Sequence, residues 1–117
     1  VVADANGLLS APVSDMRLKT NIVPISNNVD VIALLKNDNM RGVFYNWKDE
    51  KRGKSTEIGL IAQAFENILG MTGTMTATGD MYLNYDKVTS LLWEQNRLLL
   101  QKIETLEDEV KKLKEAA

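Results

Sequence analysis

The last third of the chain carries a heptad repeat, the feature that most limits how this sequence can fold. Along residues 85–117, which contain no glycine or proline, seven positions recur at alternating steps of three and four residues. We call this stripe the seam; it consists of Leu92, Asn96, Leu99, Ile103, Leu106, Val110 and Leu113. Such spacing predicts one long helix whose stripe packs against other helices. At 1.5 Å per residue the helix would be about 50 Å long, too long to be covered within one small domain.

The seam therefore needs partner helices, and copies of the same chain are the simplest partners. An intramolecular helical hairpin is the alternative, but no second helix predicted here is long enough to form it. The seam combines β-branched Ile103 and Val110 with leucines, which favours two strands, so these rules alone leave the number of copies open. The first half of the helix has a broader apolar surface, which we expect to pack on the globular part of the same chain or of a neighbour: Val88, Leu91, Leu92, Trp93, Leu98, Leu99 and Leu100.

Two short helices are predicted before the long one. Residues 27–40 have apolar side chains at helical spacing, with Asn28 as the expected cap. The face that we expect to be buried consists of Val29, Ile32 and Leu35. Residues 62–69 predict a second short helix, which Gly70 should end.

Alternating side chains predict two β-hairpins, so the fold class is α+β. In residues 41–49 one side of a strand would carry Val43, Tyr45 and Trp47. A charged turn should join it to a second strand over residues 56–61. Residues 73–85 predict another hairpin, and residues 1–13 an extended segment with a turn at Asn6-Gly7.

Composition excludes several classes of function. The chain has 117 residues, enough for one domain with a modest core, and a net charge of −2 without a basic block. We therefore expect neither nucleic acid nor a membrane as a partner. The absence of cysteine and histidine excludes disulfides, zinc–thiolate sites and a histidine general base. We expect no metal and no cofactor, and catalysis would have to rely on serine, threonine, lysine, tyrosine or carboxylates.

Ser14 and Lys19 stand five residues apart in the stretch SDMRLKTNI, residues 14–22. A serine and a lysine can form a nucleophile–base pair, but regular structure would not bring these two together. On a strand they point to opposite faces, and on a helix they lie about 140° apart. A productive pair would need an irregular turn, or two residues from different subunits.

Four stretches in the same order resemble one known family. They are SDMRLKTNI, GVFYNWK, IGLIAQAFENIL and YLNYDKVTSLLWEQNRLL, followed by the heptad helix. Together they resemble the C-terminal intramolecular chaperone domain of phage tailspikes, tail fibres and endosialidases, which also occurs in the myelin regulatory factor. The combination of Ser-Asp-x-x-Leu-Lys-x-x-Ile with Ile-Gly-x-Ile-Ala-Gln is the most specific part of the resemblance.

The resemblance implies a trimer that aligns three chains of a fibre or spike and then releases itself by autoproteolysis. It implies that Ser14 is the nucleophile and Lys19 its base. Residues 1–13 would be the end of the upstream fibre protein, 14–84 the globular chaperone part and 85–117 the oligomerisation helix. The partners would be copies of the chain and the upstream segment of the same polypeptide. We expect the chain to be part of a longer protein that assembles in the host cytoplasm, with the mature fibre on the virion tail and the released domain absent from it.

Two other functions remain open at this stage. The chain could be a permanent trimerisation foot, in which Ser14 is only a cap or turn residue. It could also be a receptor-binding tip that uses the exposed loops 49–56 and 71–80. The mass of the full-length protein separates self-cleavage from both, because only self-cleavage shortens the chain.

Overall fold

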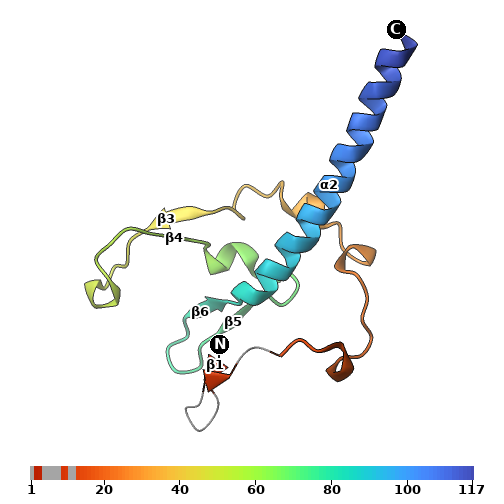
Figure 1. The fold of residues 1–117 in the computed structure, drawn as a ribbon. Coiled ribbons are helices and arrows are strands. Elements are labelled where there is room, and N and C mark those ends of the chain that lie inside the picture. Colours follow the sequence, from red (N-terminus) through yellow and green to blue (C-terminus); the bar gives the residue numbers. More distant parts are fainter. Residues whose placement is uncertain (1, 4–8, 11–12) are drawn as a thin grey trace.

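The computed structural model describes residues 2–3, 9–10 and 13–117 and has the predicted α+β class (Figure 1). Its strands form three separate two-stranded antiparallel hairpins, and one long helix, α2, spans Tyr85–Ala116. The first hairpin pairs β1, Val2–Ala3, with β2, Leu9–Ser10. The turn predicted at Asn6-Gly7 lies outside the described residues.

Helix α2 begins where the sequence predicts it to begin. Asn84 stands before the first turn, and its side-chain oxygen accepts a hydrogen bond of 3.2 Å from the backbone N–H of Lys87. This cap satisfies one of the N–H groups that a helix start leaves without a partner. With 32 residues the helix is about 48 Å long. Its C-terminal half extends beyond the rest of the chain (Figure 1).

The core lies against the first half of α2. Five side chains are buried together: Val31, Phe65, Met71, Val88 and Leu91. Gln95, on the next turn of α2, is buried beside them, and its Nε2 donates a hydrogen bond of 2.7 Å to the backbone oxygen of Val31. The first half of the helix therefore packs on the globular part of its own chain, as expected for Val88 and Leu91.

The two predicted short helices exist but are shorter than predicted. Helix α1 covers only Val31–Leu34, and its cap is Asp30, which accepts from the backbone N–H of Ala33, not Asn28. Asn28 instead ends the preceding turn η2, Ile25–Asn27, so the helix begins later than predicted and its buried side chain is Val31. Of the expected face, Val29 and Ile32 are half-buried and Leu35 is exposed.

Residues 62–69 form one 3₁₀ turn, η4, over Ala62–Phe65, so the predicted end at Gly70 is wrong. The backbone leaves helical geometry at Glu66, and Asn67 and Leu69 adopt positive φ angles of 62° and 51°. Such angles are incompatible with a continuous right-handed helix. Phe65 still reaches the core from this turn.

Both hairpins in residues 41–85 are confirmed. Strand β3, Val43–Tyr45, pairs with β4, Glu57–Gly59, and β5, Thr72–Thr74, pairs with β6, Met81–Leu83. The charged turn between β3 and β4 contains η3, Glu50–Arg52, capped by the Asp49 side chain. Trp47 lies beyond β3 but meets the edge of the Tyr45 ring, with ring centroids 5.3 Å apart.

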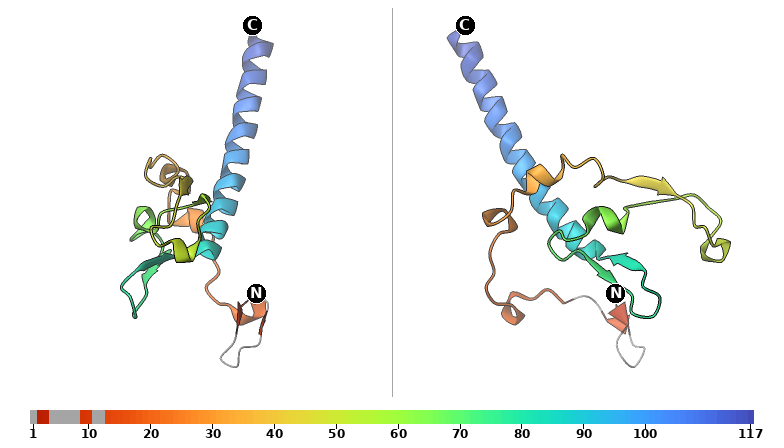
Figure 2. Two further views of the ribbon diagram at one scale, coloured as in Figure 1. Left: turned by 90° about the vertical axis from the view of Figure 1, so that its left-hand side faces the viewer. Right: turned by 180° about the vertical axis from the view of Figure 1, so that it is seen from behind.

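We call residues 41–60, the β3–β4 hairpin with its turn, the arm. In Figure 1 and in the right-hand view of Figure 2 the arm projects away from α2 on one side. Its base is held to the helix by the Tyr85 hydroxyl, which accepts a hydrogen bond of 3.2 Å from the backbone N–H of Leu60. Across the described residues, no helix is long and apolar enough to cross a membrane.

Candidate active site

Ser14 and Lys19 lie on either side of one tight turn, η1, which covers Met16–Leu18. The Asp15 side chain caps the turn by accepting from the backbone N–H of Arg17 at 2.9 Å. At the other end, the backbone N–H of Lys19 donates to the oxygen of Met16 at 3.1 Å. Asp15 and Lys19 are both extended, so the turn is only three residues long and the chain bends around it.

The bend brings the two side chains into direct contact. Lys19 Nζ lies 2.6 Å from Ser14 Oγ, a hydrogen-bond distance. Of the two geometries that the sequence leaves open, the structure has the irregular turn within one chain. The pair therefore forms without a residue from a second subunit.

Asp15 and Arg17 form an ion pair beside Ser14. Arg17 Nη2 lies 2.8 Å from Asp15 Oδ2, and Nε donates to both carboxylate oxygens at 3.2 Å. The hydrogen bonds from Arg17 lower the pKa of Asp15 and raise the pKa of Arg17. The Asp15 carboxylate thus pairs with Arg17. The Lys19 amine contacts Ser14.

The Ser14–Lys19 pair is open to solvent in the single chain. Both residues are exposed, and so are the apolar neighbours Val13, Met16 and Leu18. In this contact Lys19 Nζ is the donor and Ser14 Oγ the acceptor. A general base must instead accept the serine proton, which requires a neutral amine. The single chain therefore has the geometry of a nucleophile–base pair in which the lysine nitrogen donates.

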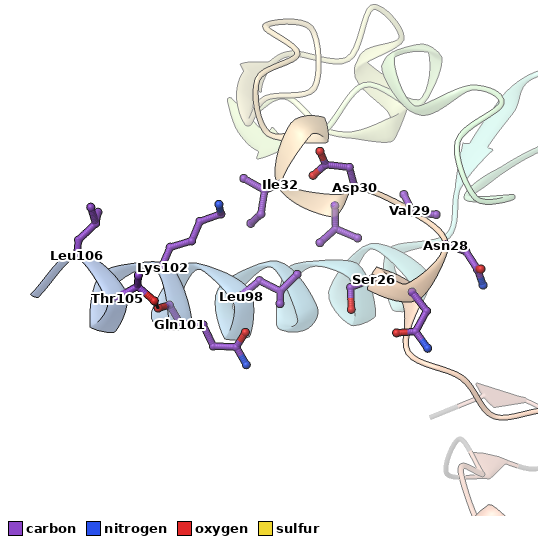
Figure 3. A pocket seen from close by; sticks show the side chains of 12 residues that line it. Ser26, Asn28, Val29, Asp30, Ile32, Leu98, Gln101, Lys102, Thr105 and Leu106 are labelled. Carbon is purple, nitrogen blue, oxygen red and sulfur yellow. Dashed lines mark hydrogen bonds between the residues drawn. The ribbon is translucent and has the colours of Figure 1, made fainter. Parts of the chain in front are cut away.

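A wide groove runs beside α2 (Figure 3). Val29, Asp30 and Ile32 line one wall, and the α2 residues Leu98 and Lys102 line the other. Its charged side chains are one carboxylate and one ammonium. In the part of the chain that the structure describes, no cluster of three or more potential metal ligands occurs. The Ser26 hydroxyl at its edge donates to Glu94 at 2.9 Å, and the Thr105 hydroxyl donates to the backbone oxygen of Gln101 at 3.0 Å.

The seam is largely uncovered in the single chain. Leu92, Ile103, Leu106, Val110 and Leu113 are exposed, as is Asn96, and Leu99 is half-buried. Trp93 and Leu100 lie next to the seam and are exposed as well, Trp93 to 76%. Of the broader apolar surface predicted for residues 88–100, these two therefore do not pack on their own chain. They widen the exposed stripe on one side of the seam.

The comparison with protein families gives one match. A model for a peptidase family with the description "Chaperone of endosialidase" matches residues 14–74, just over half of the chain. The match begins at Ser14 and includes the η1 turn, Lys19 and the arm. No curated protein matches this chain.

Proposed function

The chain belongs to the peptidase family described as the chaperone of endosialidase, and we propose that it joins and aligns three copies of a phage tail fibre or tailspike. After assembly it releases itself by cutting its own backbone beside Ser14. In this proposal residues 1–13 end the upstream fibre protein, residues 14–84 are the globular chaperone and residues 85–117 the oligomerisation helix. The start of the family match at residue 14 supports the first boundary.

The extended shape of the chain supports assembly. Its accessible surface is 9972 Å², whereas a compact monomer of 13.1 kDa exposes about 6,400 Å². The radius of gyration is 19.6 Å, against about 13 Å for a compact chain of this length. The surplus of about 3,600 Å² per chain is in the range that obligate oligomers bury.

The width of the exposed stripe supports three copies over two. In a two-stranded coiled coil the buried contact is centred on the two seam positions of each heptad, and the flanking positions are usually charged. Trp93 and Leu100 extend the apolar stripe to a third position, and both would stay in water beside a narrow dimer seam. A third helix covers this wider stripe, so three copies leave less apolar surface exposed.

The proposed chemistry uses only Ser14, Lys19 and the backbone. A neutral Lys19 amine takes the Ser14 hydroxyl proton while Oγ attacks the carbonyl of Val13, closing a five-membered ring. Attack on the carbonyl of Ser14 itself would require a strained four-membered ring. The Val13–Ser14 C–N bond then breaks, the nitrogen takes the proton from Lys19, and the ester on Oγ is hydrolysed by water.

Assembly and release serve one purpose in this proposal. Three chains of an interwoven fibre lose much conformational entropy before contacts between them compensate for it. A terminal trimer raises the effective concentration of the strands and aligns them. Cleavage then removes the trimerising domain, and the folded fibre unfolds only slowly. The proposed partners are thus the copies of the chain and its own upstream segment. Assembly would occur in the host cytoplasm, with the mature fibre on the virion tail.

The observation that carries the proposal is the 2.6 Å contact between Lys19 Nζ and Ser14 Oγ within the matched region. The test is mass spectrometry of the full-length protein after expression. Wild type should be cut at the Val13–Ser14 bond, and Ser14→Ala should form the same trimer uncut. Lys19→Ala should slow cleavage at least a hundredfold, and Lys19→Arg should not restore it, because guanidinium stays protonated near neutral pH.

Lys36→Ala is the matched control, because it removes an exposed lysine that lies outside both the η1 turn and the arm. It should be cut at the wild-type rate. An uncut wild-type trimer would show that the domain is a permanent foot. Cleavage of Ser14→Ala would show that the serine is only a turn residue.

A further inference from the structure

The arm carries an apolar face that its own chain does not cover. Phe44 and Ile58 stand directly opposite each other on β3 and β4, and they are 79% and 74% exposed. Between and beside them runs a shallow groove lined by Gly42, Val43, Gly59 and Leu60. A two-stranded hairpin is marginally stable in water unless one of its faces packs on something. The arm therefore has the shape and chemistry of an element that a partner completes.

A second uncovered apolar surface surrounds the Ser14–Lys19 pair. We call residues 13–23 the dyad segment. Its apolar residues are all exposed: Val13, Met16, Leu18, Ile22 and Val23. Both surfaces are thus apolar and exposed. The arm face is narrow and the dyad segment is irregular, so neither can be buried without a partner surface.

The two surfaces cannot meet within one chain. The arm projects from one side of α2, and the dyad segment runs along the opposite side (Figures 1 and 2). Complementary patches on opposite sides of a subunit are what a head-to-tail contact needs, and such contacts close into a ring around a rotation axis. An axis along the seam of α2 gives each chain one neighbour at its arm and another at its dyad segment.

We propose that the arm of one copy packs on the dyad segment of the next copy and covers its Ser14–Lys19 pair. The groove between Phe44 and Ile58 receives apolar side chains of the dyad segment, such as Leu18. Covering the pair excludes water from the Lys19 amine, which favours its neutral form. Ser14 and Lys19 of each active site then belong to one chain, and the arm that activates them belongs to the next. The self-cleavage in this inference rests on the proposed function.

The ring explains how cleavage would wait for assembly. A monomer cannot place its own arm on its own dyad segment, so its Ser14–Lys19 pair stays exposed to water. A dimer of this kind leaves one arm and one dyad segment uncovered, because only a closed ring satisfies every copy. Cleavage of all chains therefore requires the complete assembly.

The test uses mixed assemblies of the full-length protein. The arm variant Phe44→Thr/Ile58→Thr removes the apolar face but keeps residues that favour strands. Alone it should still assemble through α2 and be cut at least tenfold more slowly than wild type. Ser14→Ala alone should be uncut. In an equimolar random mixture, about half of the arm-variant chains receive the arm of a Ser14→Ala chain, so about half should be cut.

A variant of the dyad segment is expected to stay uncut in the same mixture, which distinguishes the two surfaces. Met16→Thr/Leu18→Thr alters the chain that must be cut, so mixing it with Ser14→Ala should not restore cleavage. Met75→Thr, on the β5–β6 hairpin, is the control for loss of exposed apolar surface and should be cut like wild type. Tags of different mass identify which chain is cut.

Each outcome bears on the inference. Rescue of the arm variant without rescue of the dyad-segment variant supports it. The inference is overturned if the arm variant alone is cut at the wild-type rate. It is also overturned if Ser14→Ala chains do not rescue the arm variant, which would mean that the arm acts on its own chain or on the upstream fibre. Uncut wild type would instead refute the proposed function.

Discussion

Leu106→Ala tests whether the seam of α2 joins the copies of the chain. Leu106 lies beyond the core, near the middle of the projecting half of the helix, and 58% of the residue is exposed in the single chain. In a trimer the three Leu106 side chains would form one buried layer. The substitution should therefore weaken assembly while the folded core of each chain keeps its stability.

The expected magnitude follows from this exposure. Truncating a fully buried leucine to alanine costs about 2 to 5 kcal/mol. Assembly can bury the 58% of Leu106 that is exposed in the single chain. In proportion, the substitution should weaken the contact between copies by about 1 to 3 kcal/mol per chain. Three chains give about 3 to 9 kcal/mol per trimer, which lowers the association constant by about two to six orders of magnitude.

Sedimentation equilibrium over a range of concentrations measures this constant. Lys112→Ala is the control, because Lys112 points away from the seam and only pairs with Asp108, Nζ to Oδ2 3.0 Å, on the exposed side of the helix. Such a pair is worth about 0.3 to 0.5 kcal/mol, so the control should stay trimeric. If Leu106→Ala associates as tightly as the wild type, the copies do not meet at the seam. A Leu106→Ala monomer with an unfolded core would show instead that Leu106 stabilises its own chain.

Three further predictions concern the stability of the globular part. Gln95→Ala should lower the free energy of unfolding by about 1 to 3 kcal/mol, measured with urea, because the buried oxygen of Val31 loses its donor. Phe65→Ala should cost about 3 to 5 kcal/mol in the same assay, because it empties a buried site of the core. Hydrogen bonds from Arg97 and then Ser26 lower the pKa of Glu94 from 4.5 to about 2. Glu94 therefore stabilises the fold above about pH 4.5, and this contribution is lost as the pH falls to about 2. Urea unfolding at several acidic pH values should show a flatter pH dependence for Glu94→Gln.

The sequence alone determined the elements whose signals are local and repeated. The start of α2 after Asn84 is fixed by a capping residue, and its length by 32 residues without a helix breaker. The hairpins β3–β4 and β5–β6 follow from alternation on both sides of turn residues. The family was evident because several short motifs stand in one order, although none of them is specific by itself.

Local signals were not enough for the short helices. Several polar residues in residues 27–40 can cap a helix, and whether Asn28 or Asp30 does so depends on where η2 turns the chain toward α2. Likewise, η4 ends at Phe65, and Asn67 and Leu69 beyond it adopt positive φ angles. Asparagine favours this conformation and leucine does not, so Asn67 is a signal that apolar spacing does not capture. Helix α1 packs on α2, whereas η4 packs on β5 and β6, so contacts between elements outweigh local propensity in both places.

The arrangement of the candidate site follows from a local turn that helical or strand periodicity does not predict. Ser14 and Lys19 are separated by a spacing that suits neither a helix nor a strand. They meet because a three-residue turn, held by the Asp15 cap, bends the backbone between two extended residues. The tertiary structure decided which apolar residues stay exposed, since Val88 and Leu91 face the core while Trp93 faces solvent on the same helix. A sequence gives the period of a helix and the order of its motifs, but the side on which the rest of the chain packs is set by contacts between residues far apart in sequence.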